Sequence, residues 1–370
     1  MTASTDWVAV AKELGPLFAQ RAAAHDADDS FVADNYADLK AHGVFAAGVP
    51  ADLGGGGAGV DELAAMLREY AHYCSSTALA LSMHTHLIAV PTWRRVHEQA
   101  PVEGLLKRVA AEQIVLVSTG AGDWLDSNGT MVKVDGGYRY TGRKSFASGS
   151  PAGSLLITSG LYEDPTKGRT VFHFPVPLDA PGVKVLDNWR TLGMRGTGSN
   201  DVIIEDVFVL DQAAGSARKQ GAFGVLHTVV LIALPLIYSV YVGIAEAARD
   251  IALQQAAKKR DLPDVQFAVG EMENHLRSAQ IALASAIEIA CSAKPGPETS
   301  SEVLIRRTLA GEGAIRTVEK AIEVVGGASF FRSLGLERLW RDVQGARFHP
   351  MPEKCQHSFT GRVTLGLDIE

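Results

Sequence analysis

The hydrophobic pattern of the chain changes twice along its length. In residues 1–112, apolar side chains recur every three or four positions, the spacing that places them on one face of a helix. The clearest series are Leu14, Phe18 and Ala22, and Leu63, Met66, Leu67 and Tyr70. This first segment predicts an N-terminal helical bundle.

Residues 113–215 have the pattern of short strands. Runs rich in Val, Ile, Tyr and Phe alternate there with turn signals such as Asp-Gly-Gly and Ala-Pro-Gly. The runs cover residues 114–118, 138–141, 155–158, 171–176 and 202–209. Because no helical segment separates them, we expect an antiparallel barrel or sandwich rather than a parallel sheet covered by helices.

Residues 216–370 return to the helical pattern. The two longest series are Val265, Val269, Met272, Leu276, Ala279, Leu283 and Ile287, and Ile305, Leu309, Ile315, Val318, Ile322 and Val325. Three or four long helices of this kind pack as an antiparallel bundle. The sequence therefore predicts an α+β, mostly α fold, with a helical domain (1–112), a central β domain (113–215) and a C-terminal helical bundle (216–370).

One stretch, residues 229–245, is uncharged and almost wholly apolar, near the lower length limit for a membrane-spanning helix. It contains Pro235 and lacks the basic anchors that flank membrane spans. We expect a helix in the core of a large protein and no membrane association.

Charge and cysteine content narrow the function classes. The formal net charge is −7, and basic residues occur in pairs rather than blocks, which disfavours a nucleic-acid partner. Cys74, Cys291 and Cys355 lie far apart and outside any CxxC motif. This pattern argues against a disulfide framework or a zinc site and suits a reducing cytoplasm. The first residues have neither a basic nor an apolar region, so we expect no export signal.

Two polar segments can carry chemistry. Residues 138–150 lead a strand into Ser-Gly-Ser, where Phe146 can lie beside a planar ligand and Ser148 can donate a hydrogen bond to its edge. In residues 188–201, glycines and hydroxyls surround Arg190 and Arg195, a combination suited to phosphate. An ordinary serine–glycine hairpin and a polar loop with solvated arginines have the same patterns, so both interpretations stay open.

Three histidines are further candidates. His84 and His86 lie two residues apart in one helical stretch, and His349 lies where two prolines stop a helix. A lone histidine is usually structural or solvated, and no additional ligand cluster indicates a metal site. The sequence therefore predicts no metal.

Taken together, five ordered motifs resemble the acyl-CoA dehydrogenase superfamily over nearly the whole chain. They are Val117-Ser-Thr-Gly-Ala-Gly-Asp123, Gly137-Tyr-Arg-Tyr-Thr-Gly-Arg-Lys-Ser-Phe-Ala-Ser-Gly149, Leu192-Gly-Met-Arg-Gly-Thr-Gly-Ser-Asn-Asp-Val202, Ile204-Glu-Asp-Val-Phe-Val209, and Val325-Gly-Gly-Ala-Ser-Phe-Phe331 with Leu336-Glu-Arg-Leu-Trp-Arg-Asp342. The resemblance implies a flavin-dependent oxidoreductase with FAD or FMN as cofactor. It also implies a homotetramer.

The resemblance assigns roles to individual residues. Phe146 takes the place of an aromatic residue packed against the flavin, and Ser148 that of a hydroxyl at the ring nitrogen that takes up hydride. The implied cofactor-binding residues are Val117, Ser118, Thr119, Phe146, Ser148, Arg195, Gly326 and Gly327. The implied substrate-binding residues are Arg190, His86 and Tyr238.

The chain departs from the family where dehydrogenases carry their base. A glutamate removes the α-proton of the thioester in those enzymes, and Pro350 takes its position here. No Asp or Glu occurs between Asp211 and Glu246, where some relatives place the base instead. Proton abstraction needs a carboxylate within hydrogen-bond reach, and Glu353 is the nearby candidate.

The adenine-binding stretch also departs from the family. Residues 258–266 lack the expected Phe-Gly, and Glu323 replaces a glutamine before the Gly-Gly pair. A negative charge near a pyrophosphate opposes its binding. The departures favour an exchangeable reduced flavin over permanently bound FAD.

A branch of the same fold, the two-component flavin monooxygenases, resembles this chain more closely. The resemblance gives His349, His84 and Ser148 catalytic roles, as donors in a dry pocket that keep activated oxygen from being lost as hydrogen peroxide. The reaction implied is oxygenation of a small organic molecule by reduced flavin from a separate reductase. The alternatives are FAD-dependent oxidation of a CoA thioester, with electron-transfer flavoprotein as a partner, and a degenerate, non-catalytic flavin- or acyl-binding member.

Overall fold

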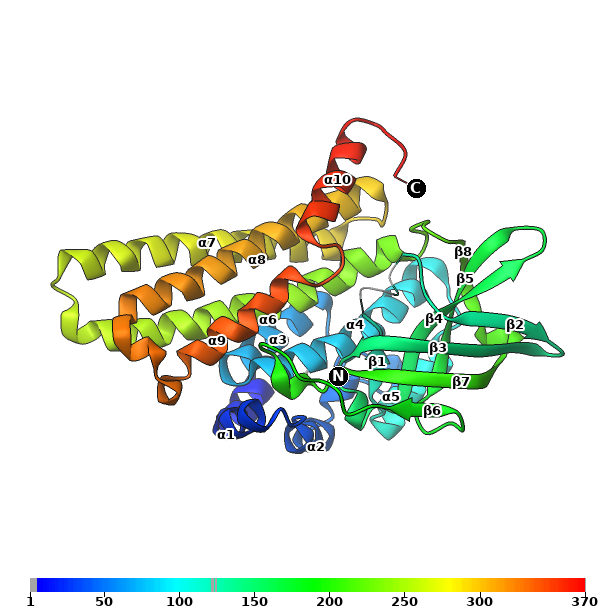
Figure 1. The fold of residues 1–370 in the computed structure, drawn as a ribbon, viewed down its shortest axis with the longest axis horizontal. Coiled ribbons are helices and arrows are strands. Elements are labelled where there is room, and N and C mark those ends of the chain that lie inside the picture. Colours follow the sequence, from blue (N-terminus) through cyan, green and yellow to red (C-terminus); the bar gives the residue numbers. More distant parts are fainter. Residues whose placement is uncertain (1–4, 121–122, 124, 370) are drawn as a thin grey trace.

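The computed structural model describes residues 5–120, 123 and 125–369, and it begins with a helical domain (Figure 1). Its helices are α1 (Trp7–Asp28), α2 (Ala33–Ala41), α3 (Val60–Tyr73), α4 (Ser75–Glu98) and α5 (Glu103–Glu112). Helix α1 starts where the carboxylate of Asp6 accepts hydrogen bonds from the N–H groups of Val8 and Ala9. It ends at Asp29, whose left-handed backbone (φ 52°) terminates the helix.

The central domain is one sheet of eight strands, in the order β6-β7-β3-β2-β4-β5-β8, with β1 added beside β4. The strands are β1 (Leu116–Ser118), β2 (Thr130–Val134), β3 (Gly137–Ala147), β4 (Leu155–Asp164), β5 (Gly168–Pro177), β6 (Val183–Val185), β7 (Asn200–Leu210) and β8 (Gly215–Lys219). Most pairs are antiparallel, as expected, whereas β1 and β2 both run parallel to β4. Because β8 pairs with β5, the sheet continues to Lys219, past the boundary expected at residue 215.

The C-terminal domain is an antiparallel bundle in which α6, α7 and α8 lie side by side (Figure 1). Its helices are α6 (Leu226–Ala256), α7 (Pro263–Ser292), α8 (Pro297–Val325), α9 (Leu336–Val343) and α10 (Glu353–Thr364). Helix α6 is long and apolar enough to span a membrane, but 94% of its most apolar window is buried inside the protein. The expectation of a core helix at residues 229–245 is thus confirmed.

Helix α6 is held in register by one buried carboxylate. Glu246 accepts hydrogen bonds from Arg68 (Nε, 2.7 Å) and from Gln280 (Nε2, 2.5 Å), and lies 3.0 Å from Nε2 of His72. Burial raises the pKa of Glu246, but the hydrogen bonds from His72 and Arg68 outweigh it and lower the pKa to about 2. This carboxylate therefore stays ionised and ties α6 to α3 and α7.

A glycine allows α6 to approach α3 closely. A Cβ atom at Gly243 would lie 2.4 Å from the carbonyl oxygen of Arg68 and 2.8 Å from Cβ of Ala71. Side chains at this position would separate the two helices, because the obstacle is backbone that cannot rotate away.

We predict that Gly243→Ala lowers the free energy of unfolding by about 1–3 kcal/mol, the usual effect of overpacking. Gly270→Ala is the matched control, since Gly270 lies on α7 and a Cβ atom there would meet nothing within 4 Å. That substitution should raise stability by up to about 1 kcal/mol through helix propensity. Urea unfolding followed by circular dichroism measures both, and equal effects of the two variants would contradict the prediction.

Candidate active site

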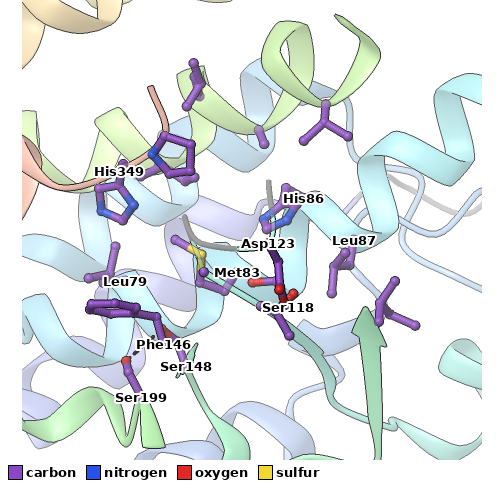
Figure 2. A pocket seen from close by; sticks show the side chains of 18 of the residues that line it. Leu79, Met83, His86, Leu87, Ser118, Asp123, Phe146, Ser148, Ser199 and His349 are labelled. Atoms are coloured by element: carbon purple, nitrogen blue, oxygen red, sulfur yellow. Dashed lines mark hydrogen bonds between the residues drawn. The ribbon is translucent and has the colours of Figure 1, made fainter. Parts of the chain in front are cut away.

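A cavity of about 580 Å³ lies where the three domains meet (Figure 2). One wall is apolar and comes from α4 and α6; it includes Leu79, Met83, Leu87, Val90, Val229, Val230, Ala233, Leu234 and Ile237. The facing wall carries hydroxyl groups and comes mainly from the β domain; it includes Ser118, Thr119, Ser148, Thr158, Ser159 and Ser199. The cavity therefore suits a planar ligand with one apolar and one polar edge.

Phe146 and Ser148 lie together at the end of β3 and both line the cavity (Figure 2). Phe146 has a left-handed backbone (φ 57°) and remains 52% exposed, with its ring edge-on to Trp189 at 5.8 Å. The Oγ of Ser148 lies 2.7 Å from the Oγ of Ser199. The segment after β3 is fixed to residues 197–198, because the N–H of Gly149 donates to the carbonyl oxygen of Thr197 (2.9 Å).

His349 also lines the cavity, and Tyr241 on α6 fixes its ring. The Tyr241 hydroxyl lies 2.6 Å from Nε2 of His349, and Arg307 donates to the His349 carbonyl oxygen (2.7 Å). Burial, with the nearby charge of Arg307, lowers the pKa of His349 to about 3, so the ring is neutral at pH 7. Burial raises the pKa of Tyr241 well above its usual value, so the phenol keeps its proton.

The proton of Tyr241 determines the tautomer of His349. Among the described residues, Nε2 of His349 is the hydrogen-bond partner found for this hydroxyl. Because a buried phenol needs an acceptor for its proton, we infer that Tyr241 donates to Nε2 and that the imidazole proton resides on Nδ1. In this tautomer Nδ1 of His349 is an N–H donor.

His86 offers a hydrogen-bond acceptor, whereas His349 offers a donor. It lines the cavity, and its Nδ1 lies 3.1 Å from the carbonyl oxygen of Ser82. A carbonyl only accepts, so Nδ1 carries the proton and Nε2 has a free lone pair. Burial lowers the pKa of His86 to about 4, which keeps the ring neutral. Figure 2 shows His86 directed into the cavity, where it offers an acceptor.

His84, for which we expected a catalytic role, is a structural residue. It does not appear among the described cavity-lining residues, and both of its nitrogens are bonded to backbone. Nε2 donates to the carbonyl oxygen of Phe45 (2.8 Å), and Nδ1 accepts from the N–H of Leu116 (3.0 Å). The two histidines are separated by two positions on α4, which turns their side chains to different faces of the helix. The lining position belongs to His86.

Several residues that the resemblance assigns to the cofactor do not line this cavity. Val117 is fully buried behind the cavity, whereas Ser118 and Thr119 line it. Ala121 and Gly122 of the same motif lie outside the described residues. Gly326 and Gly327 follow α8 and are exposed outside the cavity.

Apart from His86, the residues expected at a phosphate or substrate also lie outside the cavity. Arg195 donates to the carbonyl oxygen of Thr191 (3.0 Å), and Arg190 pairs with Asp187 (3.3 Å), so neither side chain points into the cavity. Tyr238 donates to the carbonyl oxygen of Ala346 (2.6 Å). Tyr241, one turn further along α6, is the tyrosine that lines the cavity, and nothing in the sequence distinguishes it from Tyr238.

The cavity has one carboxylate among its described lining residues, and this carboxylate is paired. Asp123 accepts a hydrogen bond from the fully buried Lys144 (2.8 Å), which also donates to the carbonyl oxygen of Asn128 (3.1 Å). Pro350 lines the cavity, and Glu353 lies exposed at the start of α10. The carboxylate found among the described lining residues is thus ion-paired through Oδ1, while its Oδ2 has no partner among the described residues.

Comparison with known proteins relates both helical domains of this chain to the acyl-CoA dehydrogenases. The profile of the acyl-CoA dehydrogenase N-terminal domain matches residues 9–111, and that of the acyl-CoA dehydrogenase C-terminal domain matches residues 236–353. The chain is 30% identical to the amino sugar nitrososynthase DnmZ of Streptomyces peucetius, over 89% of this chain and 85% of DnmZ. It is 28% identical to the putative acyl-CoA dehydrogenase YdbM of Bacillus subtilis (strain 168), over 93% of this chain and 92% of YdbM.

A solved structure shares the complete fold. KijD3, in complex with FMN and dTDP-3-amino-2,3,6-trideoxy-4-keto-3-methyl-D-glucose, has a TM-score of 0.87 and 26% sequence identity with this chain. The likeness covers 99% of this chain and 95% of KijD3. The similarity therefore includes the central β domain, which lies between the two matched domain profiles.

The buried neutral histidines predict a dependence of stability on pH. Burial lowers the pKa of His84, His86 and His173 to about 4 and that of His349 to about 3. Unfolding restores ordinary pKa values of about 6.5, so the unfolded state binds more protons in this window. The stabilisation is complete above about pH 6.5 and decreases as the pH falls toward 4.

Each such histidine should contribute about 1.4 kcal/mol per pH unit to the slope. His84→Gln should lower the slope of unfolding free energy against pH by that amount between pH 4 and 6.5. His357→Gln, which alters an exposed histidine on α10, is the control and should leave the slope unchanged. Identical slopes for both variants and the wild type would contradict this account.

Proposed function

Since the chain belongs to the acyl-CoA dehydrogenase family and is a flavin-dependent oxidoreductase, we propose that it is a monooxygenase that uses reduced flavin and O₂ on a small organic molecule. The observation that carries the proposal is the pairing of Tyr241 with His349 in a cavity whose carboxylate is already bound to Lys144. A thioester dehydrogenase needs a free base at this place. An oxygenase needs a fixed, neutral donor in a water-poor pocket.

The residues of the cavity fit a flavin. The isoalloxazine ring is planar, with an apolar edge and a polar pyrimidine edge, and the two walls of the cavity have the same division. Phe146 would pack beside the ring, and Ser148 would meet the nitrogen that takes up hydride. Ser118 and Thr119 would hold the pyrimidine side. When bound, reduced flavin supplies the electrons that activate O₂.

The two cavity histidines have complementary roles in this proposal. His349 would present Nδ1–H to the negative charge that develops on oxygen, and the hydrogen bond from Tyr241 to Nε2 would keep that proton on Nδ1. His86 presents the lone pair of Nε2 to an N–H or O–H of the substrate. The apolar faces of α4 and α6 exclude water from the reacting atoms. We therefore propose a largely apolar, uncharged substrate that carries one hydrogen-bond donor.

FMN or FAD is the cofactor in the proposal, bound as an exchangeable reduced flavin that a separate reductase supplies in the cytoplasm. The FMN bound in the KijD3 structure supports FMN, rather than FAD, as the cofactor of this chain. The similarity to YdbM supports a second candidate, oxidation of a CoA thioester with FAD and electron-transfer flavoprotein as acceptor. A degenerate member without activity is the third candidate, and the same variants separate all three.

His349→Ala should raise the share of O₂ released as hydrogen peroxide and decrease product formation roughly a hundredfold. The physical reason is the loss of one donor in a dry site, which costs about 3 kcal/mol of transition-state stabilisation. Peroxide assays and product chromatography with reduced FMN measure both quantities. Glu353→Gln is the control and should change neither, because Glu353 is exposed at the start of α10.

The reverse pattern would favour the dehydrogenase. In that case Glu353→Gln abolishes anaerobic bleaching of bound FAD by acyl-CoA thioesters, and His349→Ala is tolerated. If neither substitution alters any reaction of the flavin, both enzymatic proposals fail and the non-catalytic candidate stands.

We also propose that the protein is a homotetramer. Large apolar side chains are exposed on the bundle and directly after α8: Phe330 is 91% exposed, Phe267 71%, Phe331 69% and Ile281 62%. Large apolar side chains exposed to this degree are often covered by another subunit, and closed symmetric assemblies are the common result. Sedimentation at micromolar concentration should give a tetramer, and Phe330→Ser with Phe331→Ser should weaken it. A monomeric wild-type protein would overturn the proposal.

A further inference from the structure

Three hydroxyl groups link the polar wall of the cavity to the backbone behind it. The Oγ1 of Thr197 donates to the carbonyl oxygen of Met194 (2.9 Å) and lies 2.7 Å from the Oγ of Ser199. The Oγ of Ser199 lies 2.7 Å from the Oγ of Ser148, which lines the cavity (Figure 2). All three side chains are buried, and Thr197 is fully so.

The carbonyl oxygen of Met194, at one end of this row of hydroxyl groups, fixes which group is the donor in each hydrogen bond. Two oxygens 2.9 Å apart need a proton between them, and the Met194 carbonyl carries none. Thr197 has then used its only proton and can only accept from Ser199. Ser199 has in turn used its proton and can only accept from Ser148. Ser148 is left with lone pairs, and no proton, to present to the cavity.

From this one-way chain we infer that Thr197 and Ser199 are positioning residues that make the site select the reduced flavin. The inference rests on the proposed function, because it requires a flavin whose N5 nitrogen meets Ser148. Reduced flavin carries hydrogen on N5 and donates to an oxygen lone pair, whereas oxidised flavin has a bare N5 that needs a donor. The same acceptor suits every flavin form that keeps hydrogen on N5. In this inference Ser148 acts as an acceptor toward the flavin, whereas the sequence predicted a donor role for it.

The consequence is a difference in affinity between the two redox forms. When oxidised flavin is bound, its N5 and the Oγ of Ser148 are both acceptors and face each other without a proton. For Ser148 to donate instead, the hydroxyl groups behind it must reverse, which breaks the hydrogen bond from Thr197 to Met194. A reduced flavin completes a chain in which each hydroxyl donates once. The oxygen at Ser148 therefore discriminates between the redox states without any charged group.

Thr197→Val removes the residue that directs the chain. Ser199 then donates to Ser148, and Ser148 donates into the cavity, so binding of oxidised flavin tightens and binding of reduced flavin weakens. The ratio of the dissociation constants, oxidised over reduced FMN, should decrease roughly tenfold, because one hydrogen bond is exchanged for each form. This change corresponds to a reduction potential of bound FMN lower by about 30 mV for the two-electron couple.

Anaerobic equilibrium dialysis with oxidised and dithionite-reduced FMN measures the ratio, and dye titration measures the potential. Thr197→Ser keeps the hydroxyl and should retain the wild-type ratio. Thr85→Val is the matched control, because the Thr85 hydroxyl is also buried and donates to a backbone carbonyl, that of Leu81 (2.8 Å), away from the cavity. This variant should retain the ratio as well. If Thr197→Val impairs folding, Ser199→Ala, which frees the proton of Ser148, should lower the ratio in the same direction.

The outcomes separate the inference from the function on which it rests. A ratio unchanged in both folded Thr197→Val and Ser199→Ala, with the wild type binding both forms, overturns the inference and leaves the flavin site standing. A ratio that Thr85→Val lowers equally overturns it too. A wild-type protein that binds neither form of FMN or FAD overturns the proposed function itself.

Discussion

The rest of the structure depends on the need to cover one uncharged helix from all sides. Between Leu226 and Ala245, α6 has no Asp, Glu, Lys or Arg, and nearly every side chain is buried. Such a helix is stable in water only if other elements remove its whole surface from solvent. Helices α3 and α4 cover one side and α7 and α8 the other, which joins the N-terminal and C-terminal domains into one unit (Figure 1).

The active-site cavity is a consequence of the same packing. The end of α6 nearest the sheet faces α4 across the cavity, so the apolar residues that drive burial also keep water out of the site. Glu246 and Gly243 lie further along the helix and fix its contact with α3. The core and the pocket are therefore built from one continuous apolar surface, with polar groups added from the β domain and from the segment after α9.

Within this pocket, hydrogen bonds to backbone carbonyls decide what each polar side chain can do. The carbonyl oxygen of Ser82 accepts a hydrogen bond from Nδ1 of His86, which keeps the imidazole proton on that nitrogen. The carbonyl oxygen of Met194 accepts the hydrogen bond from the Thr197 hydroxyl, at the far end of the row of hydroxyl groups. Because a carbonyl oxygen only accepts hydrogen bonds, it fixes the imidazole nitrogen or hydroxyl bonded to it as a donor. Tyr241 does the same for His349 by donating to it. These four side chains thus act as fixed donors and acceptors.

The sequence by itself determined the three-part architecture, because the period of hydrophobic residues and the turn residues are local properties, which can be recognised without knowing the tertiary contacts. It also named Phe146, Ser148 and His349, which line the cavity, since they lie in motifs of fixed spacing next to a strand end or a helix stop. It did not distinguish His84 from His86, or Tyr238 from Tyr241, because neighbours on a helix differ only in the face they occupy. Arg190, Arg195 and Gly326 likewise matched family motifs, yet their side chains or backbone lie outside the cavity of this chain. Only the tertiary structure decided these cases, because burial, proton direction and pairing arise from residues far apart in the sequence, such as Leu116 beside His84 and Met194 behind Ser148.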